Sequence, residues 1–216
     1  MGAINRARRY KKDFMQVGEK GGAHDPMMRQ KPQKGRTLSH EDITNIYAND
    51  QIVQNIIDIP AEDATREWVS LNMEDEKLKG AIERKIRGMR AQEAMQNMVR
   101  YERLRGDGFV SIGLTEKRNF DLSDPVRPSS LKSVDYLHPF SSKRVSAINV
   151  DDDVFSSNFG DVESYRIRTN NTTGEQDVHR NRLLHLQTQR LEEMDWGQSR
   201  LEPMLKYITM FDTAAW

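Results

Sequence analysis

The stretch Arg100-Tyr101-Glu102-Arg103-Leu104-Arg105-Gly106-Asp107-Gly108 joins two segments of different periodicity, and it decides the fold class. Before it, apolar residues from Leu78 onward recur at steps of three or four, which is typical of an amphipathic helix. After it, residues 109–114 alternate as in a β-strand. Glycine is favoured just past the end of a helix, so Gly106 predicts where the helix stops. We therefore predict an α+β protein in which long helices precede a small mixed or antiparallel sheet.

The longest helical pattern covers residues 74–105, and Gly80 and Gly88 weaken it only slightly. Its apolar side carries several methionines, which are more typical of a core or a helix–helix seam than of a surface that adapts to ligands. Farther upstream, Ser39 with acidic residues behind it predicts the start of the first helix. Pro60 predicts the start of a new short helix, because proline is favoured at the first helical position.

The second half of the chain alternates between short apolar runs and polar loops. A polar loop is expected at 116–130 and a turn at 170–174. Ser199 and Glu202 predict a capping box for a last helix from Leu201. Extended segments are predicted at 68–71, 109–114, 133–137, 144–148, 163–168 and 182–186.

The 216 residues are 36% hydrophobic and 31% charged, which predicts one sizeable core with much solvated or interfacial surface. The chain has no cysteine, so disulfides and thiolate metal sites are excluded and a reducing compartment is expected. It also lacks an apolar run long enough to cross a bilayer, and no signal-peptide segment follows the basic N-terminus. We expect use in the cytoplasm or in a particle assembled there.

Charge is concentrated at the N-terminus. Residues 1–36 hold ten basic and three acidic side chains, a net charge of +7 in a chain whose total is zero. Few large apolar residues occur there, so we predict a disordered arm at 1–37 before an ordered domain at 38–216. The arm is either a solvated leader or a contact to nucleic acid or an acidic neighbouring subunit. Its candidate contact residues are Arg6, Arg8, Arg9, Lys11 and Lys12.

No pattern in the chain predicts catalysis, a cofactor or a metal site. Glycine-rich phosphate loops are missing, and the five histidines lack the spacing of a helical zinc site. His179 and His185 are predicted at opposite ends of one strand in structural roles. Residues 151–153 are three consecutive aspartates, which are expected in a solvated loop rather than around a cation. Ser199 lacks the glycine pattern of a nucleophile elbow.

Four stretches, in this order and at this spacing, resemble the portal-like proteins of tailed bacteriophages. The resemblance is to a branch formerly of unknown function, some of whose members are fused to an anti-CBASS phosphodiesterase. It spans roughly residues 40–216. The stretches are IIDIPAEDATRE at 56–67, RYERLRGDG at 100–108, VHRNRLLH at 178–185 and DWGQS at 195–199.

This resemblance implies a structural, non-enzymatic subunit of a ring, usually dodecameric, at one vertex of the phage capsid. Such a ring forms the conduit for DNA packaging and ejection and docks the head–tail connector. The implied partners are further copies of the chain, the major capsid protein, the terminase, a head–tail adaptor and double-stranded DNA, with no membrane. The implied location is the virion, after assembly in the host cytoplasm.

The order of the elements resembles the wing of a portal subunit. Residues 211–216 read as a helix cut while still running, so we expect an N-terminal part that ends before the stem and clip. A closed ring needs two different complementary faces on each subunit. The charged side of 74–105 is either an ordinary solvated face or a subunit-facing surface. Under the second reading we predict that Arg84, Arg87 and Arg90 contact the next subunit.

Two other functions remain open at this point. One is a catalytically inactive N-terminal module of a phosphodiesterase-type anti-defence protein. Those enzymes use paired His-x-Thr motifs, whereas this chain has His185-Leu186-Gln187-Thr188, one residue too long, and no second copy. The other is an accessory protein that binds nucleic acid through its basic arm.

Overall fold

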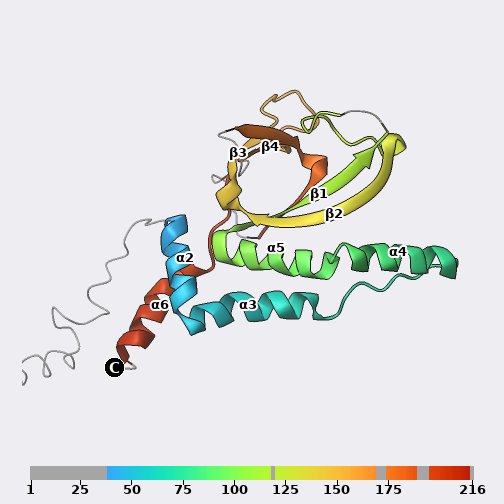
Figure 1. Cartoon of the computed structure of the whole chain (residues 1–216). Coiled ribbons are helices and arrows are strands. Elements are labelled where there is room, and N and C mark those ends of the chain that lie inside the picture. Colours follow the sequence, from blue (N-terminus) through green and yellow to red (C-terminus); the bar gives the residue numbers. More distant parts are fainter. Residues whose placement is uncertain (1–37, 118–119, 169–173, 189–194, 215–216) are drawn as a thin grey trace, which may run out of the picture. The chain divides into compact units, whose positions relative to one another are not determined.

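The computed structural model describes residues 38–117, 120–168, 174–188 and 195–214 (Figure 1). It confirms an α+β protein in which helices precede two small antiparallel sheets. The predicted arm, residues 1–37, lies outside the described residues. The helices are α2 (His40–Asn49), α3 (Gln51–Arg66), α4 (Glu76–Gly88), α5 (Ala91–Arg105) and α6 (Leu201–Ala214). The strands are β1 (Asp107–Glu116), β2 (Leu131–Ser141), β3 (Val145–Val150), β4 (Val162–Arg168), β5 (Glu175–His179) and β6 (Leu183–Gln187).

Two three-stranded sheets enclose the main core. Their strand orders are β2-β1-β6 and β3-β4-β5, with every pair antiparallel. Phe109 of β1 stacks on Phe140 of β2, with ring centroids 5.4 Å apart, and meets Tyr165 of β4 edge-on at 5.6 Å. Val145, Val178 and Leu183 complete this core. Both sheets therefore contribute aromatic or branched apolar side chains to one shared interior.

Strand β1 is covered on both faces. Phe109 and Val110 are adjacent and point to opposite sides of the sheet, yet neither is exposed. Helix α5 lies along the face opposite the sheet core (Figure 1). The turn at Gly106 thus folds the end of α5 directly back onto the strand that follows it, as the predicted glycine cap requires.

Aspartate and serine side chains define the starts of the first three helices. Ser39 and Asp42 form a capping box at α2, as expected for the predicted start. Asp50 caps α3 and Asp75 caps α4 through their side-chain oxygens. Helix α3 then buries Val53 and Ile57 on one side, consistent with its apolar spacing.

The predicted helix break at Pro60 is wrong, because α3 continues through it. Proline has no N–H to donate to the carbonyl of Ile56, four residues earlier. Arg103 of α5 supplies the missing donor: its Nη2 lies 2.9 Å from Ile56 O. A tertiary hydrogen bond therefore replaces the intrahelical one, and the helix runs on.

The single long helix predicted at 74–105 is two helices. Residues Met89 and Arg90 separate α4 from α5, and Arg90 has φ 51°, in the left-handed region. Such a conformation is uncommon for a residue with a Cβ. The break lies next to Gly88, and α4 lies roughly in line with α5 and extends beyond the sheets (Figure 1).

The predicted strands are found with shifted ends, and two predictions of extended structure differ. Residues 68–71 form no strand, and β5 lies at Glu175–His179, directly after the predicted turn, where no strand was expected. The alternation in β5 is short and polar, and its pairing partner β4 defines it. Local pattern alone was too weak to identify it.

Candidate functional site

Three of the four stretches that carry the family resemblance converge beneath β1. Asp107, at the start of that strand, is fully buried and accepts three hydrogen bonds. The donors are His185 Nε2 at 3.0 Å, Gln187 Nε2 at 2.9 Å and Gly197 N at 3.0 Å. Each comes from a different point of the C-terminal half, so one carboxylate joins β1, β6 and the segment before α6.

Tyr165 extends this network into the second sheet. Its hydroxyl lies 3.1 Å from His185 Nδ1, and the His185 ring stacks on Phe109 with centroids 4.3 Å apart. The Nε2–H tautomer of His185 satisfies both contacts, since it donates to Asp107 and accepts from the phenol. Burial and the nearby charge of Asp107 raise the pKa of Tyr165 to about 12. The phenol is therefore held neutral as a donor.

A second buried carboxylate ties α5 to the same C-terminal segment. Glu102 is 2% exposed and forms an ion pair with Arg200 at 3.4 Å, while Thr188 donates to the same oxygen. The Arg200 backbone N–H donates to Arg103 O at 2.9 Å. Burial lowers the pKa of Arg103, and the adjacent charge of Arg200 lowers it further.

Two backbone segments, at Gly106 and at Gly197, come very close to each other between these two carboxylates. Gly106 has φ +90°, and a Cβ there would lie 2.0 Å from Gly197 O. Ser199 Oγ then donates to Leu104 O at 2.7 Å and accepts from Leu201 N at 3.2 Å. The hydroxyl thus links the end of α5 to the first residue of α6. Ser199 thus lies just before the last helix, as predicted, but Glu202 N donates to the backbone carbonyl of Ser199 at 3.3 Å and not to the hydroxyl that a capping box would use.

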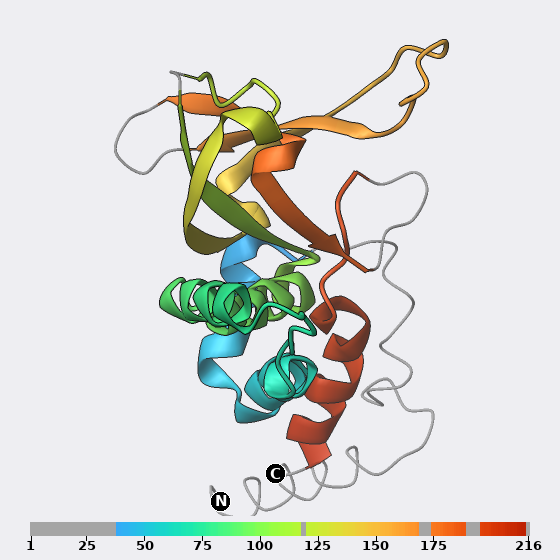
Figure 2. The ribbon, with the colours of Figure 1, turned by 90° about the vertical axis from the view of Figure 1, so that its right-hand side faces the viewer.

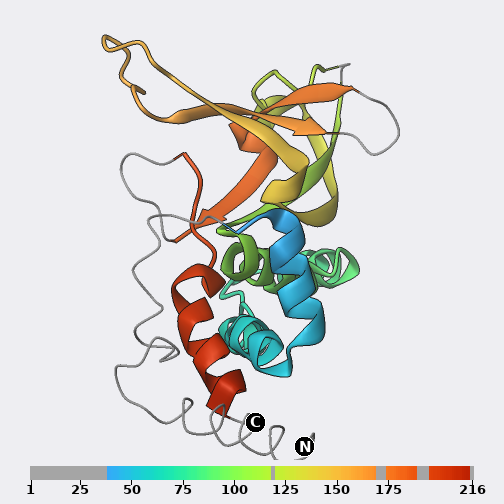
Figure 3. The same cartoon turned by 90° about the vertical axis from the view of Figure 1, so that its left-hand side faces the viewer.

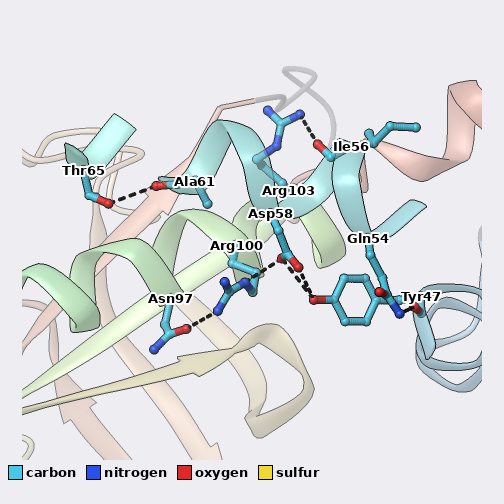
Figure 4. Close-up of polar contacts among 9 residues, drawn as sticks. All are labelled: Tyr47, Gln54, Ile56, Asp58, Ala61, Thr65, Asn97, Arg100 and Arg103. Carbon is cyan, nitrogen blue, oxygen red and sulfur yellow. Dashed lines mark hydrogen bonds and ion pairs between the residues drawn. The ribbon is translucent and has the colours of Figure 1, made fainter. Parts of the chain in front are cut away.

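The remaining stretch, on α3, is fastened to α5 (Figure 4). Arg100 Nε lies 2.6 Å from Asp58 Oδ1, and the hydroxyl of Tyr47 donates to the same carboxylate at 2.9 Å. Asn97 accepts a further bond from Arg100 at 2.7 Å. Burial and the bond to Asp58 raise the pKa of Tyr47. These contacts hold α2, α3 and α5 as one layer.

These two buried clusters, around Asp107 and Glu102, hold distant segments of the chain together, and we call them the clamp. The chain from Asp107 through His185 to Tyr165 has the residue types of an acid–base relay. Both end groups are nevertheless enclosed, at 0% and 4% exposed, and each is bonded to protein partners. The arrangement satisfies buried polar groups and fixes the register of distant segments.

A separate buried pair fastens the segment after β1. Arg182 lies 2.8 Å from Glu116, with both side chains less than a tenth exposed, and its Nε donates to Asp124 O at 3.0 Å. The guanidinium also lies over the Phe120 ring, 4.4 Å from its centroid. This contact orders part of the predicted loop at 116–130.

The predicted interface residues lie on α4, for Arg84 and Arg87, and at the break just after it, for Arg90. None of the residues of α4 is buried, and Leu78 on it is 49% exposed. Arg87 and Arg90 line an open groove of about 660 Å³, whereas Arg84 is exposed on the same helix outside the lining, with its Nε bonded to Gly80 O. The apolar part of the lining comes from Trp68, Val69, Leu71 and Ile86, and its polar part includes Glu83 and Glu93.

Sequence reasoning missed the apolar wall of this groove. The run Trp68-Val69-Ser70-Leu71 was interpreted as a strand, although it belongs to the irregular connection between α3 and α4. The sequence signal was a cluster of large apolar residues between two helical patterns, and in the structure Val69 of this cluster is 62% exposed.

The other residues considered from the sequence have local roles or lie elsewhere. Asp151 and Asp153 accept hydrogen bonds within a tight loop, from Asp153 N and Phe155 N respectively, both at 3.0 Å. His179 ends β5 and accepts from Asn181 N at 3.2 Å, and burial lowers its pKa. The candidate contact residues of the arm, which are Arg6, Arg8, Arg9, Lys11 and Lys12, lie outside the described residues.

In the part of the chain that the structure describes, no group of three or more histidine or acidic side chains is placed to hold an ion. In the same part, every helix is too short or too polar to span a bilayer.

Comparison with known proteins places the four stretches in context. The model of a family described as phage portal protein matches residues 41–216. The chain is also 27% identical over 175 residues to the anti-CBASS protein Acb1 of Caulobacter sp. (strain RHG1). That similarity covers 76% of this chain but 27% of the relative, so the chain spans about a quarter of the relative's length.

Proposed function

The chain belongs to the phage portal protein family, and from this we propose that it is a structural subunit of the portal ring at the capsid vertex. In this role the ring forms the conduit for DNA packaging and ejection and docks the head–tail connector. The subunit assembles in the host cytoplasm and resides in the virion. Its partners are other copies of itself in a dodecamer, the major capsid protein, the terminase, a head–tail adaptor and double-stranded DNA.

The structural observation that supports this proposal is the unburied extension at α4. A short helix is marginal by itself in water and normally depends on a packed apolar face. Helix α4 buries none of its residues, yet it has an apolar side and ends at a groove with apolar walls. A ring contact supplies the missing cover, because each subunit of a closed ring has a neighbour on each side.

Within this proposal, Arg84, Arg87 and Arg90 contact the next subunit, and residues 38–216 correspond to the wing. All three arginines are exposed, as a contact residue must be in a single subunit. The buried carboxylates Asp107 and Glu102 hold the wing rigid, so that its two contact faces keep a fixed geometry.

Charge reversal tests the interface directly. We expect the triple substitution Arg84→Glu, Arg87→Glu and Arg90→Glu to abolish ring formation, measured by native mass spectrometry and negative-stain electron microscopy. A matched control reverses three exposed basic residues elsewhere: Arg127→Glu, Lys132→Glu and Lys143→Glu. Rings that survive the first triple substitution, with folding verified by circular dichroism, contradict the interface.

The basic arm at residues 1–37 is proposed to contact DNA or an acidic neighbouring surface through its net positive charge. Deletion of 1–36 is expected to remove salt-dependent DNA binding while residues 38–216 stay folded. Retention of that binding after deletion contradicts the role of the arm. The same experiment examines the alternative of a basic-arm accessory protein, which binds DNA without forming rings.

The similarity to the anti-CBASS protein favours one second candidate, a catalytically inactive module of an anti-defence protein. His185 and Thr188 resemble a stretched His-x-Thr motif, but they donate to Asp107 and Glu102 in the clamp. We therefore expect no hydrolysis of a generic phosphodiester such as bis(p-nitrophenyl) phosphate. Hydrolysis that is lost in His185→Asn while the fold is kept contradicts the structural role.

A further inference from the structure

The connection between β3 and β4 projects from the sheets as a well-defined hairpin. In Figures 2 and 3 its tip stands clear of both sheets and of the helical layer. Asp151 N donates to Asp161 O at 2.9 Å, and Gly160 N donates to Asp151 O at 2.8 Å, which closes the base of the loop. Asp151 Oδ2 also accepts from Ser156 Oγ at 2.5 Å. The hairpin is thus preorganised.

The tip of this hairpin exposes large apolar side chains. Phe155 is 97% exposed, Val154 71% and Phe159 57%. An aromatic ring fully in water is costly, and aromatic side chains are enriched at the buried centres of protein interfaces. Their grouping on an ordered projection indicates a knob that inserts into a partner.

The groove beside α4 matches this knob in chemistry. Its volume of about 660 Å³ is open to the surface, and Trp68, Val69 and Ile86 provide apolar walls for an aromatic ring. The groove lining itself has Arg87 and Arg90 beside Glu83 and Glu93. The helical segment that borders it, residues 76–90, has six basic and two acidic side chains, a net charge of +4. The hairpin, residues 151–161, has four aspartates and no basic residue, a net charge of −4.

The hairpin and the groove lie on different parts of one molecule. The three views agree that the projection points away from the region of α3 and α4. One chain therefore cannot insert its own knob into its own groove as it is folded here. A knob on one surface and a groove on another make a heterologous contact, which produces rings or filaments rather than closed dimers.

We propose that the 151–161 hairpin of one subunit docks, with Phe155 foremost, into the groove beside α4 of the next copy of this chain. This inference rests on the proposed portal function and names the partner of Arg87 and Arg90. Phe155 packs against Trp68 and Val69, and Asp152 meets Arg87 on the α4 side of the groove. Opposite charges steer and register the contact, while the apolar ring supplies its buried centre.

Site-specific cross-linking tests the contact, since the chain has no cysteine of its own. In the double variant Phe155→Cys with Val69→Cys, a short bis-maleimide is expected to join successive subunits into a covalent ladder up to ring size. Neither single variant is expected to form the ladder. The matched control is Phe155→Cys with Tyr136→Cys, because Tyr136 is exposed on β2 away from the groove.

A charge swap provides an independent measurement. Asp152 is the aspartate to change, because Asp151 and Asp153 accept hydrogen bonds that shape the loop. Arg87→Glu and Asp152→Lys are each expected to weaken self-association about tenfold, and the combined variant to recover most of the loss. Additive losses in the combined variant contradict the pairing.

The size of the uncross-linked assembly separates the two possible failures. If the protein forms rings but Phe155→Cys with Val69→Cys cross-links no better than the control Phe155→Cys with Tyr136→Cys, the docking inference is overturned. The proposed portal function is then unaffected. A protein that forms no oligomer at concentrations where portal proteins assemble overturns the proposed function, and the docking inference with it. A ladder together with charge-swap recovery supports both.

Discussion

Gly106 and Gly197 are in close backbone contact, although they are distant in the sequence. Asp107, next to Gly106, accepts a hydrogen bond from Gly197 N, 90 residues further along the chain. A Cβ on Gly106 would lie 2.0 Å from Gly197 O, and one on Gly197 would lie 2.2 Å from Gly106 O. The contact lets the segment before α6 pass across the end of α5. It also brings Gly197 N to Asp107, so the glycines and the buried carboxylate form one clamp.

Alanine at either glycine is expected to destabilise the fold by about 1–3 kcal/mol or more, because overpacking against backbone cannot be relieved by a rotamer change. Gly106→Ala adds strain from its positive φ. The control is Gly160→Ala, where φ is +80° but no atom lies within 4 Å of the added Cβ, so only about 1 kcal/mol is expected. Urea denaturation measures all three. Equal losses at Gly160 and Gly106 would argue against the close approach.

Arg103 is expected to matter because Pro60 leaves the carbonyl of Ile56 without its helical partner. Arg103→Met removes the donor to that carbonyl, and the expected loss is roughly 1–3 kcal/mol. In a Pro60→Ala background the helix regains its own N–H donor. The same arginine substitution should then cost clearly less, and a double-mutant cycle measures the difference. A cycle with no coupling contradicts this explanation of the unbroken helix.

The raised pKa of Tyr165 leads us to expect that the folded protein loses stability at alkaline pH. Its folded-state pKa of about 12 exceeds the unfolded value of 10.0, so the folded protein keeps a proton that the unfolded chain releases. Its contribution is fully present below about pH 10 and is lost as the pH rises toward about 12, by roughly 2–3 kcal/mol. Denaturation between these pH values measures the slope. Tyr165→Phe is the control, and it should reduce the dependence of the unfolding free energy on pH. Some dependence should remain, because the pKa of Tyr47 is also raised.

Arg90 is expected to lower the stability of the single subunit while it contributes to ring assembly. Its left-handed backbone costs about 1 kcal/mol relative to glycine, and its side chain is 81% exposed, so Arg90→Gly should stabilise the isolated subunit by up to that amount. The same change removes a proposed contact and should weaken ring formation. Arg90→Lys keeps the charge and the strain, and serves as the control. A variant that gains neither stability nor an assembly defect contradicts both roles.

Much of the helical half could be predicted from local sequence. Ser39 and Gly106 mark helix ends through capping chemistry that needs only near neighbours. Pro60 misled because its effect depends on Arg103, which lies 43 positions away and reaches Ile56 only in the folded chain. The break at Arg90 was equally hidden, since arginine is an ordinary helix former with no local preference for positive φ.

Among the candidate sites, too, some could be predicted from the local sequence and others form only through tertiary contacts. Arg84, Arg87 and Arg90 were identified from charge density on a predicted helix, and Arg87 and Arg90 line the groove. The Asp107 clamp could not be foreseen, because His185, Gln187 and Gly197 meet Asp107 only through sheet pairing and chain reversal. The hairpin tip was interpreted as a solvated acidic loop. Phe155 in the middle of that loop was the overlooked signal.

Negative-stain electron microscopy of the purified protein, with native mass spectrometry on the same sample, tests most directly whether this chain forms a portal ring. A portal subunit is expected to form closed rings with a central hole and a mass that is a whole multiple of the 25.1 kDa subunit. A monodisperse monomer of 25.1 kDa at all concentrations that can be reached would contradict the portal-ring assignment for this chain.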